Sequence, residues 1–291
     1  MNRIRVAILG LGLIGGSLGM ALHKKAGDEI EVVGFARRQA TAELALAMGA
    51  VDSMAQTAQE AVSEADFVFI CTPVLQMLSM AEAVLPHMKP GSVLSDVGST
   101  KSWFIEQLRA KLPPDIHYIG GHPMAGRERS GLEAAQEDLF QDKWFIFTSF
   151  PDVPPELFDK LRRLLTLTGA KTAQLDETTH DRVTSVISHV PHVVAAALVH
   201  LLKKEKDTVL TARFIGGGFR DTTRIASSDA DMWADICVTN PANIASGLES
   251  LAGLLLGAAE MIRAGDRQGI WEYFSQAKEL REGLLEREKD L

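Results

Sequence analysis

Residues 4–17 read Ile-Arg-Val-Ala-Ile-Leu-Gly-Leu-Gly-Leu-Ile-Gly-Gly-Ser, and this stretch decides the fold of the chain. The apolar run at residues 4–9 predicts a short buried strand. The glycines after it open a helical pattern: the first permits a tight turn, the second lets the backbone approach a pyrophosphate, and the third lets helix and strand pack closely. A helix N-terminus at this point attracts phosphate. The stretch therefore predicts a dinucleotide site made by Gly10, Gly12, Leu13, Ile14 and Gly15.

The pattern of strand followed by helix continues through the first half of the chain. Apolar runs at residues 66–71 and 92–96 predict two further buried strands. Ligands of open parallel sheets bind outside the carboxyl ends of the strands. We therefore expect the residues after these runs to lie near a nicotinamide ring and the substrate. These residues are Cys71, Thr72 and Pro73 after the first run, and Ser99 and Lys101 after the second. For Ser99, a simple helix N-cap is an equally good interpretation.

The end of the predicted strand at residues 31–35 bears on the choice of cofactor. An NAD site usually carries Asp or Glu there, to bind the ribose 2′-hydroxyl. This chain instead has Ala36, followed by Arg37 and Arg38. With no carboxylate to repel a 2′-phosphate and two guanidinium groups to bind one, the local chemistry favours NADP over NAD. The alternative, in which the arginines are solvated or stack on the adenine, leaves NAD open.

The composition is that of a soluble globular protein of two domains. The chain has 291 residues, of which 46% are hydrophobic and 23% charged. Its net charge of −8 argues against a general nucleic-acid or membrane-surface role. The N-terminus lacks the pattern of a signal peptide, and the most apolar stretch, residues 251–259, is too short to span a bilayer. We therefore expect a cytoplasmic protein without a membrane partner, in which Cys71 and Cys237 are buried thiols.

A second glycine-rich stretch carries the strongest candidate for catalysis. Residues 120–126 read Gly-Gly-His-Pro-Met-Ala-Gly and follow a predicted strand at residues 117–119. We expect His122 to sit on a tight loop whose backbone is restrained by the flanking glycine and proline. A catalytic base must stay within hydrogen-bond reach of one substrate proton, and this mounting provides that. An isolated His-Pro more often marks a loop histidine that caps a neighbour, but the nucleotide site upstream favours the catalytic interpretation.

The second half of the chain is predicted to be helical. An apolar stripe over residues 177–203 surrounds Ser188, His189 and His192, and Pro191 among them predicts a bend. We expect this bend to aim Ser188 and His192, one turn apart, into a cavity, whereas a satisfied core histidine is the alternative for His189. No third ligand of suitable spacing follows the two histidines, so we predict no metal site.

Three glycines at residues 216–218 precede a pair of arginines. The glycines predict the end of a helix and a backbone open to close approach. Arg220 and Arg224 are one helical turn apart, so both can face one site, and arginine is the natural bidentate partner of a carboxylate. Asp221 is expected to orient one of them. The alternative is a solvated charged face.

The last two predicted helices, residues 240–264 and 267–288, have more apolar positions than a small domain can bury. We therefore expect a homodimer interface there. The sequence thus divides into an α/β Rossmann-type domain at residues 1–152 and an all-α C-terminal substrate and dimerisation domain at residues 153–291. The apolar positions in question are Ile244, Leu248, Leu251, Leu255 and Ile262.

Six motifs occur in an order that resembles one enzyme family. The set resembles the prephenate/arogenate dehydrogenases of tyrosine biosynthesis over nearly the whole chain. The first two motifs occur in many Rossmann enzymes, whereas the last three together are specific. The motifs are Gly-Leu-Gly-Leu-Ile-Gly-Gly-Ser at 10–17, Cys-Thr-Pro at 71–73, Asp-Val-Gly-Ser-Thr-Lys at 96–101, Gly-Gly-His-Pro-Met-Ala-Gly at 120–126, Ser-His-Val-Pro-His at 188–192 and Gly-Phe-Arg-Asp-Thr-Thr-Arg at 218–224.

This resemblance implies oxidative decarboxylation of prephenate to 4-hydroxyphenylpyruvate, or of arogenate to tyrosine, with hydride transfer to NAD or NADP. His122 would be the catalytic base that accepts the proton of the ring C4 hydroxyl, and Ser99 would hydrogen-bond that hydroxyl. Arg220 stands where many members have Lys. The implied substrate site consists of Arg224 for a carboxylate, Ser188 and His192 as pocket lining, Glu128 as a polar gate, and Arg220 and Lys101 as further positive charge for a dianion.

Two other functions stay open on the sequence. A related β-hydroxyacid dehydrogenase would rely on a catalytic lysine in the helical half, where this chain has lysines only at a polar helix end, residues 203–206. A non-catalytic NADP-binding sensor would not require His122, Ser188, His192 and Arg224 to occur together. Prephenate and arogenate differ only in a keto or amino group, and no single residue decides between them.

Overall fold

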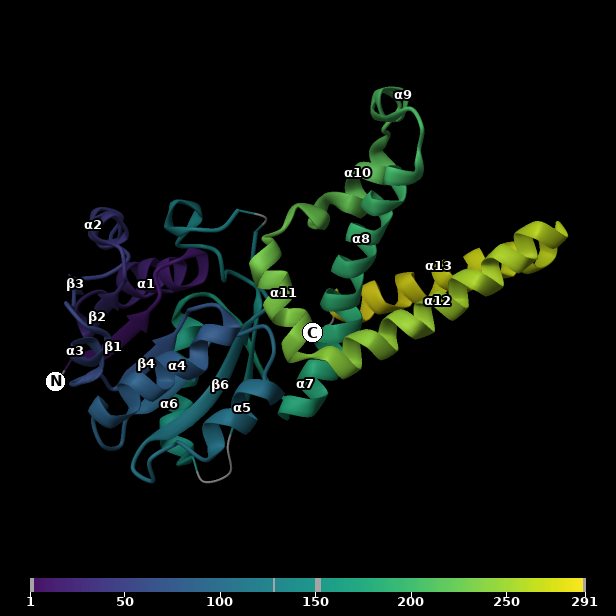
Figure 1. The fold of residues 1–291 in the computed structure, drawn as a ribbon. Coiled ribbons are helices and arrows are strands. Elements are labelled where there is room, and N and C mark those ends of the chain that lie inside the picture. The colour runs from purple at the N-terminus through teal and green to yellow at the C-terminus, as the bar shows by residue number, and fades with distance from the viewer. Residues whose placement is uncertain (1–2, 128, 150–152, 290–291) are drawn as a thin grey trace. The chain divides into compact units, whose positions relative to one another are not determined.

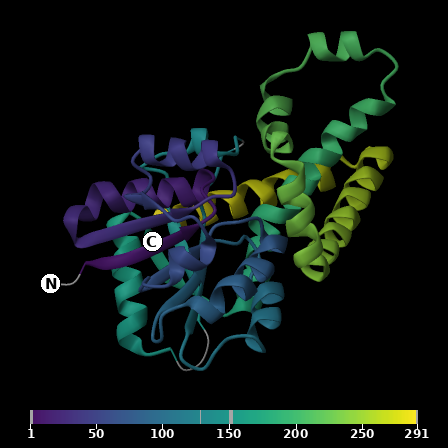
Figure 2. The same ribbon diagram turned by 60° about the vertical axis from the view of Figure 1, so that its left-hand side comes forward.

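The computed structural model describes residues 3–127, 129–149 and 153–289. The chain divides into two compact units, residues 1–241 and 242–291. The first unit contains a β-sheet, the helices that cover it and a further set of helices, whereas the second is built from two long helices (Figures 1 and 2).

A β-sheet forms the centre of the first unit (Figure 1). It has eight strands in the order β3-β2-β1-β4-β5-β6-β7-β8. Strands β1 to β6 are parallel, whereas β7 runs antiparallel to β6 and parallel to β8. The order of the first six strands is that of a doubly wound dinucleotide-binding sheet, so the predicted Rossmann-type fold is confirmed. The strands are β1 (Ile4–Leu9), β2 (Ile30–Phe35), β3 (Ser53–Met54), β4 (Phe67–Ile70), β5 (Val93–Asp96), β6 (His117–Pro123), β7 (Trp144–Ser149) and β8 (Lys171–Gln174).

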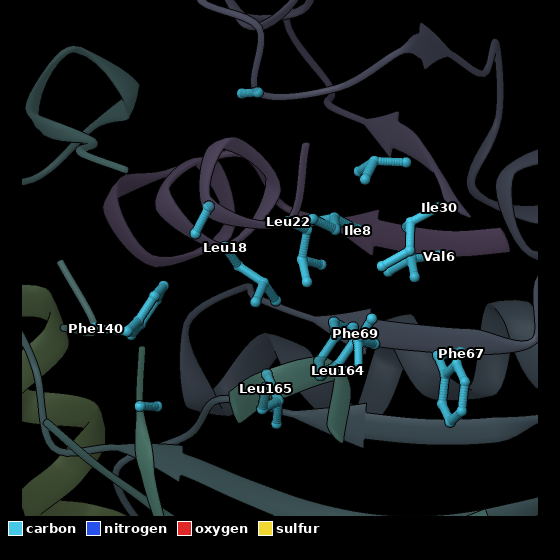
Figure 3. Packing of buried hydrophobic residues seen from close by; sticks show 14 of the residues in the cluster. Val6, Ile8, Leu18, Leu22, Ile30, Phe67, Phe69, Phe140, Leu164 and Leu165 are labelled. Atoms are coloured by element: carbon cyan, nitrogen blue, oxygen red, sulfur yellow. The ribbon is translucent and has the colours of Figure 1, made fainter. Parts of the chain in front are cut away.

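Each face of the sheet has its own hydrophobic core. Successive residues of β1 point to opposite faces, so Val6 and Ile8 pack with α1 and α6 (Figure 3), whereas Ala7 and Leu9 pack with α3, α4 and α5. Burial on both faces explains why residues 6–9 are apolar throughout. The α-helices of the first unit are α1 (Leu13–Ala26), α2 (Gln39–Ala47), α3 (Ala58–Val62), α4 (Val74–Val84), α5 (Ser102–Arg109), α6 (Pro155–Leu167), α7 (Glu177–Thr184), α8 (Val190–Leu201), α9 (Thr208–Arg213), α10 (Gly217–Thr223) and α11 (Ala230–Thr239).

The sheet continues past residue 152, where we placed the start of the helical half. Helix α6 buries Leu161, Leu164 and Leu165 in the first core, and β8 pairs with β7. Because α6 is an ordinary amphipathic helix and β8 has only four partly exposed residues, neither stands out in the sequence from the helices that follow. Residues 155–174 thus pack as part of the α/β fold.

A π-helical turn interrupts the apolar stripe predicted over residues 177–203. Helix α7 ends at Thr184, the π turn occupies Ser185–His189, and α8 begins at Val190. Pro191 is among the first residues of α8, in a helical run that continues from Glu177 to Lys204. A π turn thus lies directly before the proline, at the place where the sequence predicts a bend, and both π turns and prolines are common sites of helix kinks. Such turns are frequent at functional sites.

The glycines at residues 216–218 begin a helix instead of ending one. Gly216 is the N-cap of α10, and the next two glycines form its first turn. Glycine is acceptable at an N-cap, where the backbone is not yet helical. A 3-10 segment, Arg224–Ser227, follows α10, and both pack against α8.

The second unit consists of α12 (Pro241–Ala264) and α13 (Arg267–Lys289), joined through Gly265 at a φ of +65°. Of the apolar positions predicted for an interface, Leu255 and Ile262 are exposed, whereas Ile244 is buried. The unit thus displays apolar side chains that its own two helices do not cover. The large exposed ones are Leu254, Leu255, Leu256, Ile262, Trp271, Phe274, Leu280, Leu284 and Leu285.

Candidate active site

A cleft of about 1050 Å³ opens at the carboxyl ends of β1, β2 and β4. Gly10 permits the turn at its base, because its φ is +103° and a Cβ there would come within 2.9 Å of the carbonyl of Cys71. The turn brings together residues that are distant in the sequence. The predicted cofactor residues that line the cleft are Gly10, Gly12, Ala36, Arg37, Arg38, Cys71, Thr72 and Pro73.

The glycine-rich turn fits a dinucleotide. Nothing lies within 4 Å of the point where a Cβ would stand on Gly12, the N-cap of α1, so a phosphate has room at this helix N-terminus. At Gly15 a Cβ would come within 2.1 Å of the Gly10 carbonyl oxygen, so this glycine lets α1 pack close to β1. The side chains of Leu13 and Ile14 pack against the core and do not line the cleft, which leaves their backbone N–H groups in the first helical turn to face a phosphate.

Positive charge lines the cleft at the end of β2. Arg37 and Arg38 are both exposed, and Nη2 of Arg37 lies 3.5 Å from Oε1 of Gln76. Among the described residues that line the cleft, none is Asp or Glu. The cleft therefore presents guanidinium groups, and no carboxylate, beside the expected position of the adenosine ribose.

The two cysteines are unpaired thiols, as the sequence predicts, but they are half-buried and not buried. Burial, together with the charge of Asp96, raises the pKa of the Cys71 thiol far above its ordinary value. Cys71 therefore lines the cofactor cleft as a neutral thiol and is not a nucleophile.

His122 lies within a strand and not on the loop that we expected. Antiparallel pairing with β7 extends β6 to Pro123, and His122 stands opposite Ile146. Only 8% of His122 is exposed. Strand β5 approaches closely beside it, since a Cβ on Gly121 would come within 2.6 Å of the Asp96 carbonyl oxygen. The imidazole is thus mounted on the sheet itself.

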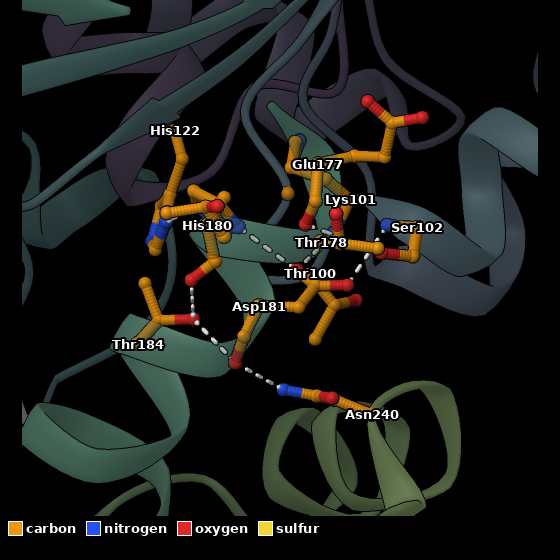
Figure 4. Close-up of polar contacts among 12 residues, drawn as sticks. Thr100, Lys101, Ser102, His122, Glu177, Thr178, His180, Asp181, Thr184 and Asn240 are labelled. Atoms are coloured by element: carbon orange, nitrogen blue, oxygen red, sulfur yellow. Dashed lines mark hydrogen bonds and ion pairs between the residues drawn. The ribbon is translucent and has the colours of Figure 1, made fainter. Parts of the chain in front are cut away.

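His122 is the first member of a chain of three buried side chains (Figure 4). Its Nδ1 lies 2.8 Å from Nε2 of His180, and Nδ1 of His180 lies 2.8 Å from Oδ1 of Asp181. His180 and Asp181 are neighbours on α7, which the sequence places in the helical half. The chain therefore joins the sheet to that helix.

The carboxylate of Asp181 also caps helix α5. Its Oδ1 accepts the backbone N–H of Lys101 and its Oδ2 that of Ser102, both at 2.8 Å. These N–H groups have no partner inside the helix, so the carboxylate satisfies them and meets the positive end of the helix dipole. Ser99 is not the N-cap of α5, which is Lys101. The alternative role of Ser99 as a simple cap is therefore wrong, and its half-buried side chain lies in the loop after β5.

The protonation states along this chain follow from its burial. Burial lowers the pKa of His122 well below its ordinary value, and the charges of His180 and Lys101 act in the same direction. Burial also lowers the pKa of His180, although its hydrogen bond to Asp181 opposes this. For Asp181, burial raises the pKa, but hydrogen bonds from His180, Ser102 and Lys101 outweigh burial and lower it. Two neutral imidazoles and one carboxylate result at neutral pH.

Lys101 does not face the substrate, contrary to our expectation. Its side chain is completely buried, where Nζ pairs with Oδ1 of Asp96 and donates to the Gly121 carbonyl at 2.7 Å. Asp96 also accepts hydrogen bonds from the backbone N–H of Gly98 at 2.7 Å and the hydroxyl of Tyr118 at 2.5 Å. The reason is that Lys101 stands at the N-cap of α5, and its side chain turns back to Asp96 at the end of β5. Its role is to hold β5, β6 and α5 together behind His122.

Two further histidines flank one indole. The ring of His192 stacks on Trp233 at 3.8 Å between centroids, and His189 meets the same ring edge-on at 6.1 Å. His192 is half-buried, and its Nδ1 donates to the Ser188 carbonyl at 2.8 Å. His189 is buried, which lowers its pKa to about 4, and its Nδ1 lies 3.4 Å from Nδ2 of Asn240. His189 is therefore a core histidine, whereas His192 remains a candidate for substrate contact.

The predicted substrate arginines lie on the surface near α8. Arg220 is exposed on α10, and Arg224 is exposed at the end of that helix. Both segments pack against α8, which carries His192. Glu128, the predicted gate, lies outside the described residues. Within the described ranges, no three His, Cys, Asp or Glu side chains are grouped to hold a metal ion.

Sequence reasoning missed four residues of this site: Asp96, His180, Asp181 and Trp233. The sequence held a signal for two of them. His180 and Asp181 are adjacent polar residues at the start of an apolar stripe, and polar side chains that are buried in such a place are usually hydrogen-bonded to each other or to a nearby group. Neither Asp96 nor Trp233 has a local pattern that reveals its partner.

Two family models match the chain. Residues 18–174 match "Prephenate dehydrogenase, nucleotide-binding domain", and residues 176–276 match "Prephenate dehydrogenase, dimerization domain". The chain belongs to the prephenate dehydrogenase family. This family member is therefore an NAD(P)-dependent oxidoreductase of tyrosine biosynthesis, with a nucleotide-binding α/β domain and a helical dimerisation domain, and the resemblance carried by its motifs is confirmed. The first match ends with β8, in agreement with the extent of the sheet.

Named relatives cover nearly all of this dehydrogenase. It is 39% identical to "Prephenate dehydrogenase" of Bacillus subtilis (strain 168) over 99% of this chain and 79% of the relative. It is 31% identical to "Cyclohexadienyl dehydrogenase" of Zymomonas mobilis over 96% of this chain and 95% of the relative. Among solved structures, prephenate dehydrogenase from A. aeolicus in complex with hydroxyphenyl propionate and NAD+ has a TM-score of 0.89 and 28% identity, covering 98% of this chain and 99% of that one.

Two helical stretches of this dehydrogenase are long and apolar enough to cross a membrane: Glu177–Lys204 and Pro241–Ala264. The second is longer than the apolar stretch that we judged too short from the sequence. Both lie within the matched dimerisation domain of a family of soluble enzymes. The first carries the buried His180 and Asp181, which a lipid-facing helix would not hold. Both are thus helices of the dimerisation domain and not membrane spans.

Proposed function

We propose that this chain oxidatively decarboxylates prephenate to 4-hydroxyphenylpyruvate, that it also accepts arogenate, and that His122 is the base. The observation that carries this proposal is a buried imidazole at the end of β6, on the sheet that builds the nucleotide cleft, where burial lowers the pKa of His122. A neutral imidazole is ready to accept a proton at neutral pH. The names of the relatives from B. subtilis and Z. mobilis support the two substrates.

The reaction requires the protein to position the substrate against the cofactor and to accept one proton from it. His122 accepts the proton of the hydroxyl on ring carbon C4, and Ser99 hydrogen-bonds the same hydroxyl. When bound in the cleft, NAD or NADP supplies the acceptor for the hydride that leaves C4. Breaking the bond to the ring carboxylate releases carbon dioxide and leaves an aromatic ring, so the reaction is strongly downhill.

Replacing Arg224 by alanine is expected to raise the KM for prephenate roughly 10- to 100-fold, with a much smaller effect on kcat, because a charge-assisted hydrogen bond to a substrate carboxylate is lost. Steady-state kinetics measure both constants. Arg162→Ala, which removes an exposed arginine from α6, is the matched control. A lower kcat at unchanged KM would assign Arg224 to the chemistry and contradict a binding role.

We propose NADP as the preferred cofactor over NAD. The support is local, because Arg37 and Arg38 line the cleft and no described lining residue carries a carboxylate. A guanidinium group pairs with a phosphate by two parallel hydrogen bonds, which a ribose 2′-hydroxyl does not match.

Neutralising both arginines tests this choice. The Arg37→Gln/Arg38→Gln double variant is expected to raise the KM for NADP roughly 10- to 100-fold, while the KM for NAD changes little, because only NADP loses a charge-assisted contact. Rates with each cofactor at saturating substrate measure the effect, and NAD serves as the internal control. Equal losses with both cofactors would show that the arginines stack on adenine or are solvated.

We propose that the second unit forms a homodimer through the exposed apolar side chains of α12 and α13, which are more numerous than a monomer's surface usually carries. Aromatic residues such as Trp271 and Phe274 are enriched in such interfaces. The net charge of −8 disfavours a nucleic-acid or membrane partner, and we propose a cytoplasmic location.

One experiment tests the proposed function: initial rates of cofactor reduction at 340 nm with prephenate or arogenate, each with NAD or NADP. We expect clear rates with prephenate, and with NADP above NAD. A rate only with arogenate would correct the substrate. Silence in all four combinations, with cofactor binding shown by fluorescence, would favour a non-catalytic sensor or a β-hydroxyacid substrate.

A further inference from the structure

We propose that His180 and Asp181 hold His122 in the tautomer whose Nε2 is the basic atom, so that His180 is a positioning residue for the proton transfer. This inference rests on the proposed role of His122 as the base. It goes beyond that role by naming the ring nitrogen that accepts the proton and the groups that fix it.

The assignment begins at Asp181, whose oxygens are already committed as acceptors. Oδ1 receives the backbone N–H of Lys101 and Oδ2 that of Ser102. Since two N–H donors and a helix N-terminus face this group, it is a carboxylate and has no proton to give. The 2.8 Å contact between its Oδ1 and Nδ1 of His180 must therefore be a hydrogen bond that Nδ1–H of His180 donates.

The tautomer of His122 follows from that of His180. A neutral His180 that is protonated at Nδ1 presents a lone pair at Nε2. Nε2 of His180 lies 2.8 Å from Nδ1 of His122, so Nδ1–H of His122 is the donor. The remaining ring nitrogen of His122, Nε2, then carries the lone pair that accepts the substrate proton. One direction of donation thus runs along the whole chain, from His122 through His180 to Asp181.

The charged groups around His180 favour this neutral form. Asp181 on its own helix and Asp96 on β5 attract a proton to His180, whereas Lys101, at the N-cap of α5, repels one. His122 on β6 and His189 are further titratable neighbours of His180, and His122 in turn lies near Lys101 and His189. Burial decides the balance, because the ring of His180 is completely inaccessible to solvent. A charged His180 would donate from both nitrogens and could not accept from His122.

His180 makes hydrogen bonds that a residue used only for packing would not need. A side chain that only fills space in a core is served by an apolar residue, since a buried imidazole must have its nitrogens satisfied. Both nitrogens of His180 are bonded, one to the proposed base and one to a carboxylate. The carboxylate is itself fixed by helix α5, so α5 and α7 hold the orientation of the imidazole pair.

Three variants separate positioning from packing. His180→Leu removes the acceptor, and we expect kcat with prephenate to fall roughly 10- to 100-fold at nearly unchanged KM, because the base loses its fixed tautomer and orientation. His180→Gln places an amide oxygen near the former position of Nε2, and we expect it to regain most of the lost kcat. Thr184→Val is the matched control: its hydroxyl donates to the His180 carbonyl at 2.9 Å, so it perturbs the same buried turn without touching the ring, and kcat should remain unchanged.

A second measurement reads the tautomer directly. Nitrogen-15 NMR of ring-labelled histidine distinguishes a protonated ring nitrogen from one with a lone pair, and His122→Asn identifies the His122 signals. In the wild-type protein without substrate, we expect Nδ1 of His122 to be protonated and Nε2 to be free. In His180→Leu, we expect a mixture of the two tautomers.

The outcomes separate this inference from the proposed function. A wild-type His122 protonated at Nε2 would overturn the inference even in an active enzyme, as would a folded His180→Leu protein with wild-type kcat or a His180→Gln protein no better than His180→Leu. If the wild-type protein is inactive in all substrate and cofactor combinations, the proposed function fails, whereas the expected tautomer in the NMR spectrum would still support the hydrogen-bonded chain.

Discussion

Replacing His122 by asparagine is expected to lower kcat roughly 10²- to 10⁴-fold while the KM for prephenate stays nearly constant, because general base catalysis contributes about this much. Asparagine can still accept and donate hydrogen bonds but cannot take up a proton. The substrate would be bound by groups that this change leaves intact, among them Arg224. Steady-state kinetics of the purified variant measure both constants, and fluorescence titration with the cofactor checks that the cleft is unaffected.

The pH dependence of the wild-type enzyme completes this test. Burial lowers the pKa of His122, so the neutral base persists at pH values below the ordinary histidine pKa of about 6.5. The active form exists above the pKa of His122, and kcat/KM should therefore stay level from neutral pH to below about 6.5 and fall only in more acidic solution. Near-normal turnover of His122→Asn, or a wild-type profile that falls already above pH 7, would show that another group is the base.

Removing the charge of Asp96 is expected to destabilise the fold by about 3–5 kcal/mol, because it leaves the ammonium of Lys101 buried without a counter-charge. Both side chains have no solvent exposure. In the Asp96→Asn variant, Lys101 keeps the Gly121 carbonyl but loses the carboxylate. Burial raises the pKa of Tyr118, so the phenol stays protonated and cannot replace that charge. Urea unfolding, followed by circular dichroism at a fixed protein concentration, measures the loss.

Two comparisons show whether the buried pair is responsible. Lys101→Met removes the ammonium, and in the double variant Asp96→Asn/Lys101→Met no buried charge remains, so we expect the double variant to regain part of the stability that Asp96→Asn loses. Glu82→Gln breaks an exposed ion pair with Lys111 and should change stability by at most about 1 kcal/mol. An Asp96→Asn variant no less stable than Glu82→Gln would contradict the role assigned to the pair.

Local patterns in the sequence were sufficient for the fold of the first half and for the cofactor cleft. The structural roles of Gly10 and Gly15 can be predicted from the sequence, because a strand, a turn with a positive φ and a helix must follow one another within a few residues. The apolar runs predicted β1, β4 and β5 for the same reason, since burial on both faces of a parallel sheet demands continuous hydrophobicity. The strand ends then predicted which residues line the cleft.

Tertiary structure alone decided the surroundings of His122. The strand β6 reaches this residue because β7, which follows it in the chain, pairs alongside it, and no local signal announces that pairing. Lys101 looked like a substrate ligand because its residue type fits an anion, but its partner Asp96 lies across a turn that buries both. His180 and Asp181 meet the base only because α7 docks on the N-terminus of α5, about 80 residues away in the sequence.

The sequence by itself determined which residue types and backbone turns the nucleotide site requires, because these depend on near neighbours in the chain. Which side chains are buried together behind the base depends on contacts between distant segments, and those exist only once the chain has folded.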